Sequence, residues 1–411
     1  MTRMFRDPVF GLDADVVRRS VENVAPPGAA TDIVDLFARA AWSGIAEPGD
    51  STAGFLVSAV GASAALAMLV ERWSADRIVR ESMVDVDTAA FATQLDRALV
   101  RWLPRLDSRS TVRQLTLAAT CRAVLVTPEH PSWPERLDDL GPHAPLALWL
   151  RGRTDALRDT AHSVALVGAR AATGYGEHVA MEAGSGLADR GFVIVSGAAY
   201  GIDGMAHRAA LASQSTTVAF LAGGVDRPYP SGHSNLIGRI IDTGAVVSEV
   251  PCGGAPSKWR FLQRNRLIAA VGDATIVLEA GWRSGSLNTA GHAAALGRPL
   301  GAVPGPITSA ASAGCHRLIR EYGAVCVTTV DEMAELAGMS PGETNEDAAA
   351  RSSEETRVLD ALSVRSPRSP GDIATRSGLP VGTVQSVLGL LELGDLVAEK
   401  PEGWVFVPQR P

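Results

Sequence analysis

From residue 163 onward, the chain alternates short, almost uninterrupted apolar runs with longer stretches of helical periodicity. Apolar runs without polar alternation are typical of strands buried on both faces, and helical spacers join such strands in parallel. The pattern predicts an α/β fold: an extended Rossmann-like, doubly wound, mainly parallel sheet. The predicted strands are residues 164–167, 192–195, 217–221, 245–247, 274–278, 300–303 and 325–327.

The loops that follow these predicted strands are rich in glycine, serine and arginine. In a doubly wound sheet the loops at the carboxyl ends of the strands gather at one edge, where ligands bind. The sequence therefore predicts that residues far apart in the chain become neighbours there. The loops are residues 168–176, 196–203, 222–230, 280–286 and 304–305.

Three further regions flank the predicted sheet. Residues 1–110 carry Ala-rich helical patterns and predict an N-terminal helical domain, while apolar runs at 123–126 and 146–150 predict extra strands within an α/β domain spanning 111–335. A polar stretch at 336–354 predicts a linker. Residues 355–411 predict three helices and a hairpin, the pattern of a winged helix-turn-helix domain.

The composition argues for a reduced, soluble protein. The 411 residues carry a net charge of −7, so any nucleic-acid binding must be confined to one face. The four cysteines lack CxxC spacing, and the N-terminus lacks the plan of a signal peptide, which together predict a cytoplasmic protein. The uncharged stretch 54–70 predicts a buried helix, with no membrane insertion.

Residues 251–320 are unusually basic. Eight Lys and Arg residues stand against two acidic ones, a formal charge of +6. The segment contains Lys258 and the run Phe261-Leu262-Gln263-Arg264-Asn265-Arg266, in which two guanidinium groups flank an amide. Arginine forks suit phosphate oxygens, so the segment predicts a polyanion-binding face. The alternative is a solvated basic surface without a ligand.

The first glycine-rich loop predicts an anion cradle. Gly168 ends a predicted strand and permits close backbone approach, Arg170 adds a charge, and Gly174 opens a helix whose amides are free. The spacing is not G-x-G-x-x-G, and the second strand ends without an acidic ribose-binding residue. A nicotinamide cofactor site is therefore not expected, and no cofactor is predicted.

The second loop contains Ser196, Gly197 and Gly201 and leads into a helix with Asp203 and His207 four residues apart. These two side chains could be a catalytic dyad, but a structural role is favoured: Asp203 as cap or loop anchor, with His207 packed against it. No third group completes a triad, and no metal-ligand spacing occurs in the sequence. No catalytic residue is predicted.

The third loop, Ser284-Gly285-Ser286, predicts a second anion cradle at the start of a helix. Two cradles together with Arg264 and Arg266 could follow consecutive phosphates, which one nucleotide would not require. Aromatic residues accompany these loops and could stack on unpaired bases, so we expect a single-stranded nucleic acid. These aromatic residues are Tyr200, Tyr229, Trp259, Phe261 and Trp282.

The chain resembles the DprA/Smf family of bacterial DNA-processing proteins over roughly residues 120–330, in collinear order. The resemblance rests on Val167-Gly168-Ala169-Arg170, Ser196-Gly197, Gly201-Ile202-Asp203, Ala206-His207, Tyr229-Pro230, Ser248-Glu249, Phe261 to Arg266, Ser284-Gly285-Ser286, Thr289-Ala290 and Pro304-Gly305. It implies a dimeric, non-enzymatic mediator that binds single-stranded DNA, displaces single-strand-binding protein and loads a RecA-type recombinase during recombination or natural transformation. It also implies an N-terminal domain of SAM or helix-hairpin-helix type.

Site residues follow from this resemblance by position. It implies phosphate contacts from Arg170, Lys258, Arg264 and Arg266, cradles formed by Gly168, Ser196, Gly197, Gly201, Ser284 and Gly285, and neighbouring contacts from Phe261, Asn265 and Ser286. The chain departs from the family pattern at Tyr200, where Arg is common, and at Leu262, where Pro is common. The resemblance implies no residues for the recombinase or dimer surfaces.

Two other functions compete with this prediction. A Rossmann-type nucleotide phosphoribohydrolase would use a carboxylate and an arginine, for which Glu279 and Arg283 are candidates, but its P-G-G-x-G-T loop is absent. A transcriptional regulator would read DNA through the winged helix. The predicted recognition helix, residues 381–393, contains no Lys or Arg, so we favour a protein-contact or accessory role for it.

Overall fold

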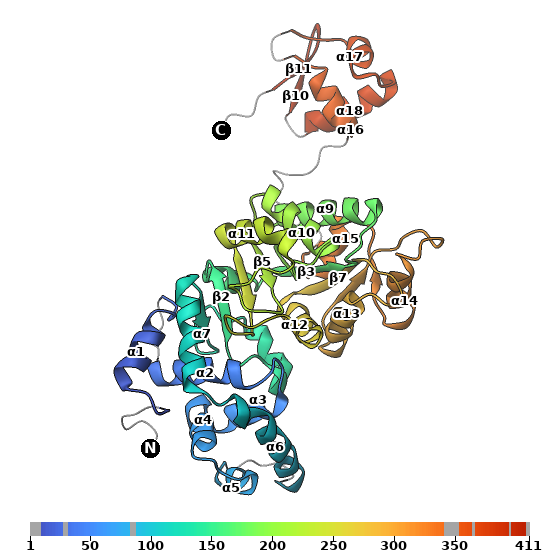
Figure 1. Cartoon of the computed structure of the whole chain (residues 1–411). Coiled ribbons are helices and arrows are strands. Elements are labelled where there is room, and N and C mark those ends of the chain that lie inside the picture. The colour runs from blue at the N-terminus through green and yellow to red at the C-terminus, as the bar shows by residue number, and fades with distance from the viewer. Residues whose placement is uncertain are drawn as a thin grey trace. The chain divides into compact units, whose positions relative to one another are not determined.

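The protein is described by a computed structural model covering residues 10–27, 32–82, 88–340, 353–363, 366–393 and 396–407 (Figure 1). The chain divides into two compact units, Met1–Ser340 and Pro341–Pro411. Most of the predicted linker, residues 341–352, lies outside the described residues.

The first unit is organised around a nine-stranded sheet of order β1-β2-β6-β5-β4-β3-β7-β8-β9. The strands from β6 to β9 in that order pair in parallel, while β1 and β2 extend one edge antiparallel. The predicted α/β fold is therefore confirmed. The strands are β1 (Val124–Val126), β2 (Leu148–Gly152), β3 (Ser163–Gly168), β4 (Val193–Ser196), β5 (Thr217–Phe220), β6 (Ala245–Ser248), β7 (Ala274–Glu279), β8 (Leu300–Ala302) and β9 (Val325–Cys326).

Helices cover both faces of the sheet, because side chains alternate between two apolar cores. On β3, Ala165 and Val167 enter one core, whereas Val164 and Leu166 enter the other. The first core is covered by α8 (Asp155–Asp159), η3 (Glu135–His143), α12 (Lys258–Val271), α13 (Ser286–Ala295) and α14 (Ala313–Glu321). The opposite face is covered by α9 (Gly174–Asp189), α10 (Ile202–Ala212), α11 (Ser234–Thr243) and α15 (Val330–Leu336), and the short helix η4 (Ser231–His233) leads into α11.

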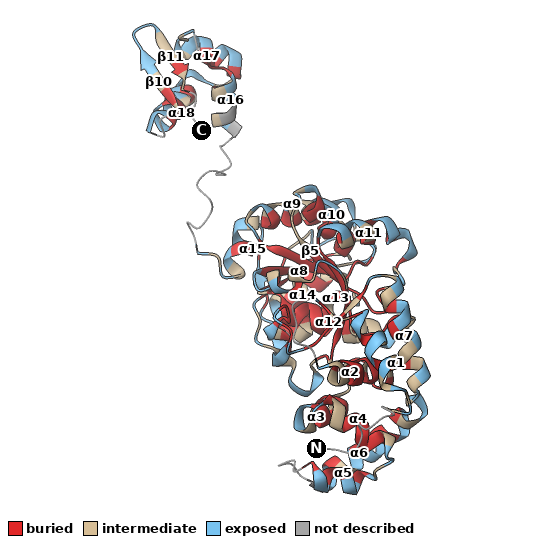
Figure 2. Cartoon of the chain, turned by 90° about the vertical axis from the view of Figure 1, so that its left-hand side faces the viewer, coloured by how far each residue is buried: buried red, intermediate tan, exposed pale blue. Residues whose placement is uncertain are grey.

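The N-terminal region is helical, as predicted. Its own core contains Trp42 and Trp102, whose rings meet edge to face at 5.2 Å. A second apolar core joins residues of α1, α2 and α7 to β1, β2, β5 and β6. Figure 2 shows these three helices next to one another, with their buried residues in red. The helices are α1 (Ala14–Glu22), α2 (Ile33–Ile45), α3 (Ser51–Val60), α4 (Ala62–Val70), α5 (Ala75–Glu81), α6 (Thr88–Trp102), η2 (Leu103–Arg105) and α7 (Ser108–Thr120).

The single helix predicted over residues 54–70 is wrong. Gly61 adopts φ +83°, which ends α3 and starts α4, and the direction of the chain bends by 109° between the two helices. Both helices contribute buried residues to the N-terminal core. In the described ranges no single helix is long and apolar enough to cross a membrane, although this bent pair passes that test by length and composition.

The second unit is a small winged helix-turn-helix domain, as predicted. It contains α16 (Ser353–Asp360), α17 (Pro370–Ser377), α18 (Val381–Leu393), β10 (Val397–Lys400) and β11 (Gly403–Phe406). Helix α18 buries Val384, Leu388 and Leu391 in the domain's core. Its outer face exposes Leu390 and Leu393 and, as in the sequence, carries no Lys or Arg.

Candidate nucleic-acid interface

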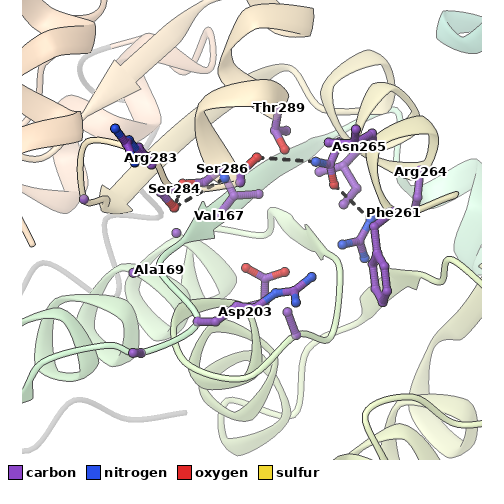
Figure 3. Close-up of a pocket in the computed structure, with 18 of the residues that line it drawn as sticks. Val167, Ala169, Asp203, Phe261, Arg264, Asn265, Arg283, Ser284, Ser286 and Thr289 are labelled. Atoms are coloured by element: carbon purple, nitrogen blue, oxygen red, sulfur yellow. Dashed lines mark hydrogen bonds between the residues drawn. The ribbon is translucent and has the colours of Figure 1, made fainter. Parts of the chain in front are cut away.

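A cavity of about 950 Å³ opens at the carboxyl ends of β3 and β7 (Figure 3). These strands are adjacent in the sheet although the strands between them in sequence lie on the other side of β3. The order of strands therefore reverses at this point, which is where doubly wound sheets bind ligands. The loops after both strands line the cavity, together with one side of α12.

Helix α12 forms one wall with Lys258, Phe261, Arg264 and Asn265. The hydroxyl of Ser257 caps the helix by accepting from the backbone N–H of Arg260 at 3.2 Å. This cap begins the helix immediately before Lys258, whose side chain is exposed at the rim. All four predicted residues therefore lie on one surface.

Aromatic and cationic groups surround Phe261. The Arg170 guanidinium lies 4.9 Å from its ring centroid, and the ring of Tyr229 lies 5.5 Å away. Both neighbours line the cavity. The predicted aromatics Tyr200, Trp259 and Trp282 are each about half exposed but do not line it.

The loop before α13 forms the facing wall with Arg283, Ser284, Gly285 and Ser286. The Ser284 and Ser286 hydroxyls share a hydrogen bond of 2.8 Å at the start of the helix. The Asn265 amide donates to the Asn288 side-chain oxygen at 3.2 Å and ties α12 to α13. Hydroxyls and a helix N-terminus favour an anion here.

Arg264 forms part of the cavity floor and is almost fully buried. Its Nη1 donates to the carbonyl oxygens of Gly197 at 2.7 Å and Phe220 at 2.8 Å. Burial lowers the pKa of Arg264 to about 10, against the opposing effect of Asp203. The guanidinium thus holds the β4 and β5 loops in place, and most of its donors are engaged within the protein.

Asp203 anchors the same floor from α10. Its carboxylate accepts from the backbone N–H of Gly197 at 3.2 Å. Burial raises the pKa of Asp203, while the charge of Arg264 and backbone donors oppose the shift. The loop-anchoring role predicted for Asp203 agrees with this geometry.

Three predicted cradle residues support the floor and do not line the cavity. The buried Ser196 hydroxyl donates to the Leu166 carbonyl at 2.6 Å. A Cβ on Gly197 would clash with the Arg264 guanidinium. Gly201 has φ +74°, and its Cβ would strike the backbone of the β3 loop. Ser196 therefore supports the floor through a hydrogen bond, and Gly197 and Gly201 allow the close packing of its backbone.

The anion cradle expected at the start of α9 is occupied by the protein itself. Glu279, at the end of β7, accepts from the Thr173 hydroxyl at 2.6 Å and from the Thr173 N–H at 2.9 Å. Gly176 leaves the space in which this carboxylate lies. The loop still contributes Gly168 and Arg170 to the cavity, but the helix N-terminus faces Glu279.

Arg266 lies outside the cavity. Its Nη2 donates to both carboxylate oxygens of Glu249, at 2.9 and 2.7 Å, and the two side chains are 3% and 12% exposed. A buried, paired guanidinium cannot reach a phosphate without breaking this pair. The structure therefore does not bring Arg266 together with the other predicted site residues.

Most of the basic excess of residues 251–320 is neutralised by carboxylates. Five of its eight cations form ion pairs, and Arg264 is buried beside Asp203. Within the described ranges Lys258, Arg283 and Arg170 form no ion pair, and the Arg170 guanidinium lies over the ring of Phe261. Arg283 was not among the residues predicted to bind nucleic acid, although its position next to Ser284 of the predicted anion cradle could have indicated it. The paired cations are Arg260, Arg266, Arg298, Arg317 and Arg320.

His207 is buried on α10 and does not contact Asp203 through a hydrogen bond. Thr217 donates its hydroxyl proton to the Ile194 carbonyl at 2.6 Å, so His207 Nδ1 must donate to that hydroxyl at 2.7 Å. Burial, reinforced by neighbouring positive charge, lowers the pKa of His207 to about 3. The imidazole is therefore neutral and structural.

This shift predicts acid sensitivity. The unfolded chain binds a proton at this imidazole near the ordinary pKa of 6.5, whereas the folded chain does not. The contribution of neutral His207 to the unfolding free energy is therefore fully present above pH 6.5 and is lost as the pH falls towards 3. We expect His207→Gln to reduce the slope of unfolding free energy between pH 6.5 and 5 by up to about 1.4 kcal/mol per pH unit. Urea unfolding measures it, with the exposed His178→Gln as control. Equal slopes for both variants would contradict the assignment.

The fold and the cavity define a class of protein: a Rossmann-like α/β protein with cations and aromatic rings at the switch point of its sheet. A family model described as DNA recombination-mediator protein A matches residues 124–338, and a second, described as DprA winged helix domain, matches residues 342–403. The chain belongs to the DprA/Smf family.

Known relatives agree with this membership. A Mycobacterium tuberculosis (strain H37Rv) protein that carries the name DprA is 46% identical over 297 residues, covering 68% of this chain and 76% of its own. Protein Smf of Escherichia coli (strain K12) is 36% identical over 270 residues, covering 64% and 71%. The solved structure of DNA processing protein A from Streptococcus pneumoniae superposes with a TM-score of 0.58 at 28% identity, covering 75% of this chain and 98% of that one.

Proposed function

We propose that this chain is a DNA-processing protein that binds single-stranded DNA in the cavity between α12 and α13. One observation carries the proposal: Arg170, Lys258 and Arg283 line the same cavity as Phe261 and Tyr229, and among the described residues none of the three cations forms an ion pair with a carboxylate. Cations at the rim attract a sugar-phosphate backbone, while the wall suits exposed base faces.

The same wall favours an unpaired strand over a duplex. In a duplex the bases stack on one another, so Phe261 and Tyr229 offer it little. An unpaired base can stack on an aromatic ring and gain about 1–3 kcal/mol. The Ser284 and Ser286 hydroxyls and the start of α13 then provide donors for a phosphate beside that base.

We extend the proposal to a mediator function. The family to which the chain belongs is described as a recombination mediator, which supports loading of a RecA-type recombinase and displacement of single-strand-binding protein. A homodimer in the cytoplasm completes the proposal. We propose these partners for the whole chain and name no residues that contact them.

A phosphoribohydrolase is the rival activity, and the position of Glu279 weighs against it. Both oxygens of this carboxylate accept hydrogen bonds from Thr173, and the side chain is 2% exposed. Glu279 is also absent from the residues that line the cavity. A general base or nucleophile must reach its substrate, so this carboxylate is better explained as a link between the β3 and β7 loops.

The first test compares strands. We expect a labelled dT oligonucleotide to bind at least about tenfold more tightly than a hairpin duplex of equal length, with affinity falling by a log–log slope of about 0.7 per phosphate contact as salt rises. Fluorescence anisotropy measures both ligands. Equal affinities, or release of free base from nucleoside monophosphates, would refute the proposal.

A variant ending at Ser340 separates cavity binding from binding by the winged helix, because residues 341–411 form their own compact unit. The truncated chain should retain its preference for single strands. Complete loss of binding would move the site to the second unit and favour a regulator that reads DNA there.

A further inference from the structure

Two opposite faces of helix α12 make different contacts. One face, with Lys258, Phe261 and Asn265, lines the cavity. The opposite face, with Arg260, Gln263 and Arg266, meets the loop between α2 and α3, residues 46–50, here called the acidic loop. The acidic loop therefore touches the DNA-facing helix without touching the cavity.

Glu47 in the acidic loop binds two arginines. Its Oε2 accepts from Arg260 Nε at 2.9 Å and its Oε1 accepts from Arg260 Nη2 at 3.1 Å, a bidentate pair. Arg105 reaches the same carboxylate at 2.9 Å. Burial raises the pKa of Glu47, but the hydrogen bonds and charges of the two arginines outweigh this and lower it below its ordinary value. The carboxylate is thus ionised at neutral pH.

Arg260 also contacts the segment at the edge of the cavity. Its Nη1 donates to the Ala255 carbonyl at 2.8 Å, within the segment that leads to Pro256 and Ser257 at the cavity edge. Lys258 stands two residues before Arg260 in the first turn of α12. Fixing Arg260 therefore fixes both the approach to the helix and the turn that presents Lys258.

The acidic loop is held against α12 at a second point. Gly49 has φ +74°, and a Cβ there would clash with the side chain of Gln263. The Gly49 N–H donates to Glu249 Oε1 at 3.2 Å, and Glu249 in turn binds Arg266 of α12. With this close approach, movement of Glu47 relative to the helix is restricted.

We propose that Glu47 is a positioning residue for single-stranded DNA binding, acting through Arg260 to hold Lys258 and its turn in the binding arrangement. This inference rests on the proposed function. It gives the N-terminal helical region a part in ligand binding, although none of its residues lines the cavity.

The direction in which Glu47→Gln changes the DNA affinity distinguishes a positioning role from a simple effect of charge. Removing a carboxylate near a polyanion site reduces repulsion, so charge alone predicts equal or tighter binding after Glu47→Gln. Positioning predicts weaker binding. It also predicts a smaller salt slope although no cation has been removed, because a displaced Lys258 no longer neutralises a phosphate.

The experiment measures dT oligonucleotide binding by full-length protein over a salt series. We expect Glu47→Gln to weaken binding about fivefold and lower the slope by about 0.7. Glu81→Gln, an exposed carboxylate at the end of α5, removes the same charge and should change neither quantity. Unchanged or tighter binding by Glu47→Gln would overturn the inference, and thermal melting would detect a variant that fails to fold.

A double-mutant cycle identifies the route through Arg260. If Glu47 acts through that side chain, the double variant Glu47→Gln/Arg260→Gln should bind no more weakly than Arg260→Gln alone. Additive losses would overturn the inference. If wild-type protein fails to bind the oligonucleotide, the proposed function fails; if Lys258→Ala weakens binding but Glu47→Gln does not, only the positioning role fails.

Discussion

Replacing Arg170, Lys258 and Arg283 together by alanine should weaken dT oligonucleotide binding by about 10²–10³-fold, the largest loss expected for any binding variant. Each side chain can make a charge-assisted phosphate contact, and an exposed contact of this kind contributes about 1–1.5 kcal/mol. The log–log salt slope should fall by about 2 units, since three contacts are lost. Anisotropy titrations at four salt concentrations give both quantities.

A matched control removes three other exposed cations. Arg18 and Arg19 on α1 and Arg80 on α5 are exposed, and their replacement by alanine gives the same change in net charge. If binding depends only on the overall charge of the protein, both triple variants will lose the same affinity. That outcome, or an unaltered slope in a folded cavity variant, would contradict the site.

Replacing Arg266 by methionine should lower the unfolding free energy by about 3–5 kcal/mol, because Glu249 would remain largely buried after losing its cationic partner. The sequence suggested a different result, a loss of phosphate contact. Arg266 lies outside the cavity, and Glu249 keeps its hydrogen bond from the Gly49 N–H in this variant, so the salt slope of DNA binding by the folded fraction should not change. Urea unfolding and oligonucleotide titration together separate these expectations.

A second substitution tests why Arg266→Met lowers the unfolding free energy. Glu249→Gln removes the charge yet retains an oxygen that can accept from the Gly49 N–H, so adding it to Arg266→Met should restore most of the lost stability. If the double variant is as unstable as the two single losses combined, the cost does not arise from an unpaired carboxylate.

Much of the fold was predictable because its signals are local. Each predicted strand from 164–167 to 325–327 coincides with an observed strand within about two residues, since buried parallel strands are nearly continuous apolar runs. Helix α18 matches its predicted range, residues 381–393, completely. The break at Gly61 was missed, because an apolar helix and two shorter apolar helices share the same composition.

The site was harder to predict because its electrostatics depend on distant partners. Arg260 pairs with Glu47, 213 residues earlier in the chain, and no local pattern reveals that neutralisation. Lys258 and Arg266 lie on different sides of α12, and the position of the helix relative to the sheet decides which side faces the cavity. In the same way, Glu279 reaches Thr173 across 106 residues and fills a position that looked suitable for an anion.

The apolar core shared by α1, α2, α7 and the edge strands has a practical consequence for how the protein can be dissected. A fragment beginning at β1 would lack α1, α2 and α7, three of the helices that share an apolar core with Leu125, Trp149 and Val246 in the intact chain. Such a fragment would expose apolar residues on this face of the sheet, and it would also lack the acidic loop. Poor solubility or weak DNA binding of that fragment would then report an uncovered sheet, whereas a cut after Ser340 leaves every side chain of this core in place.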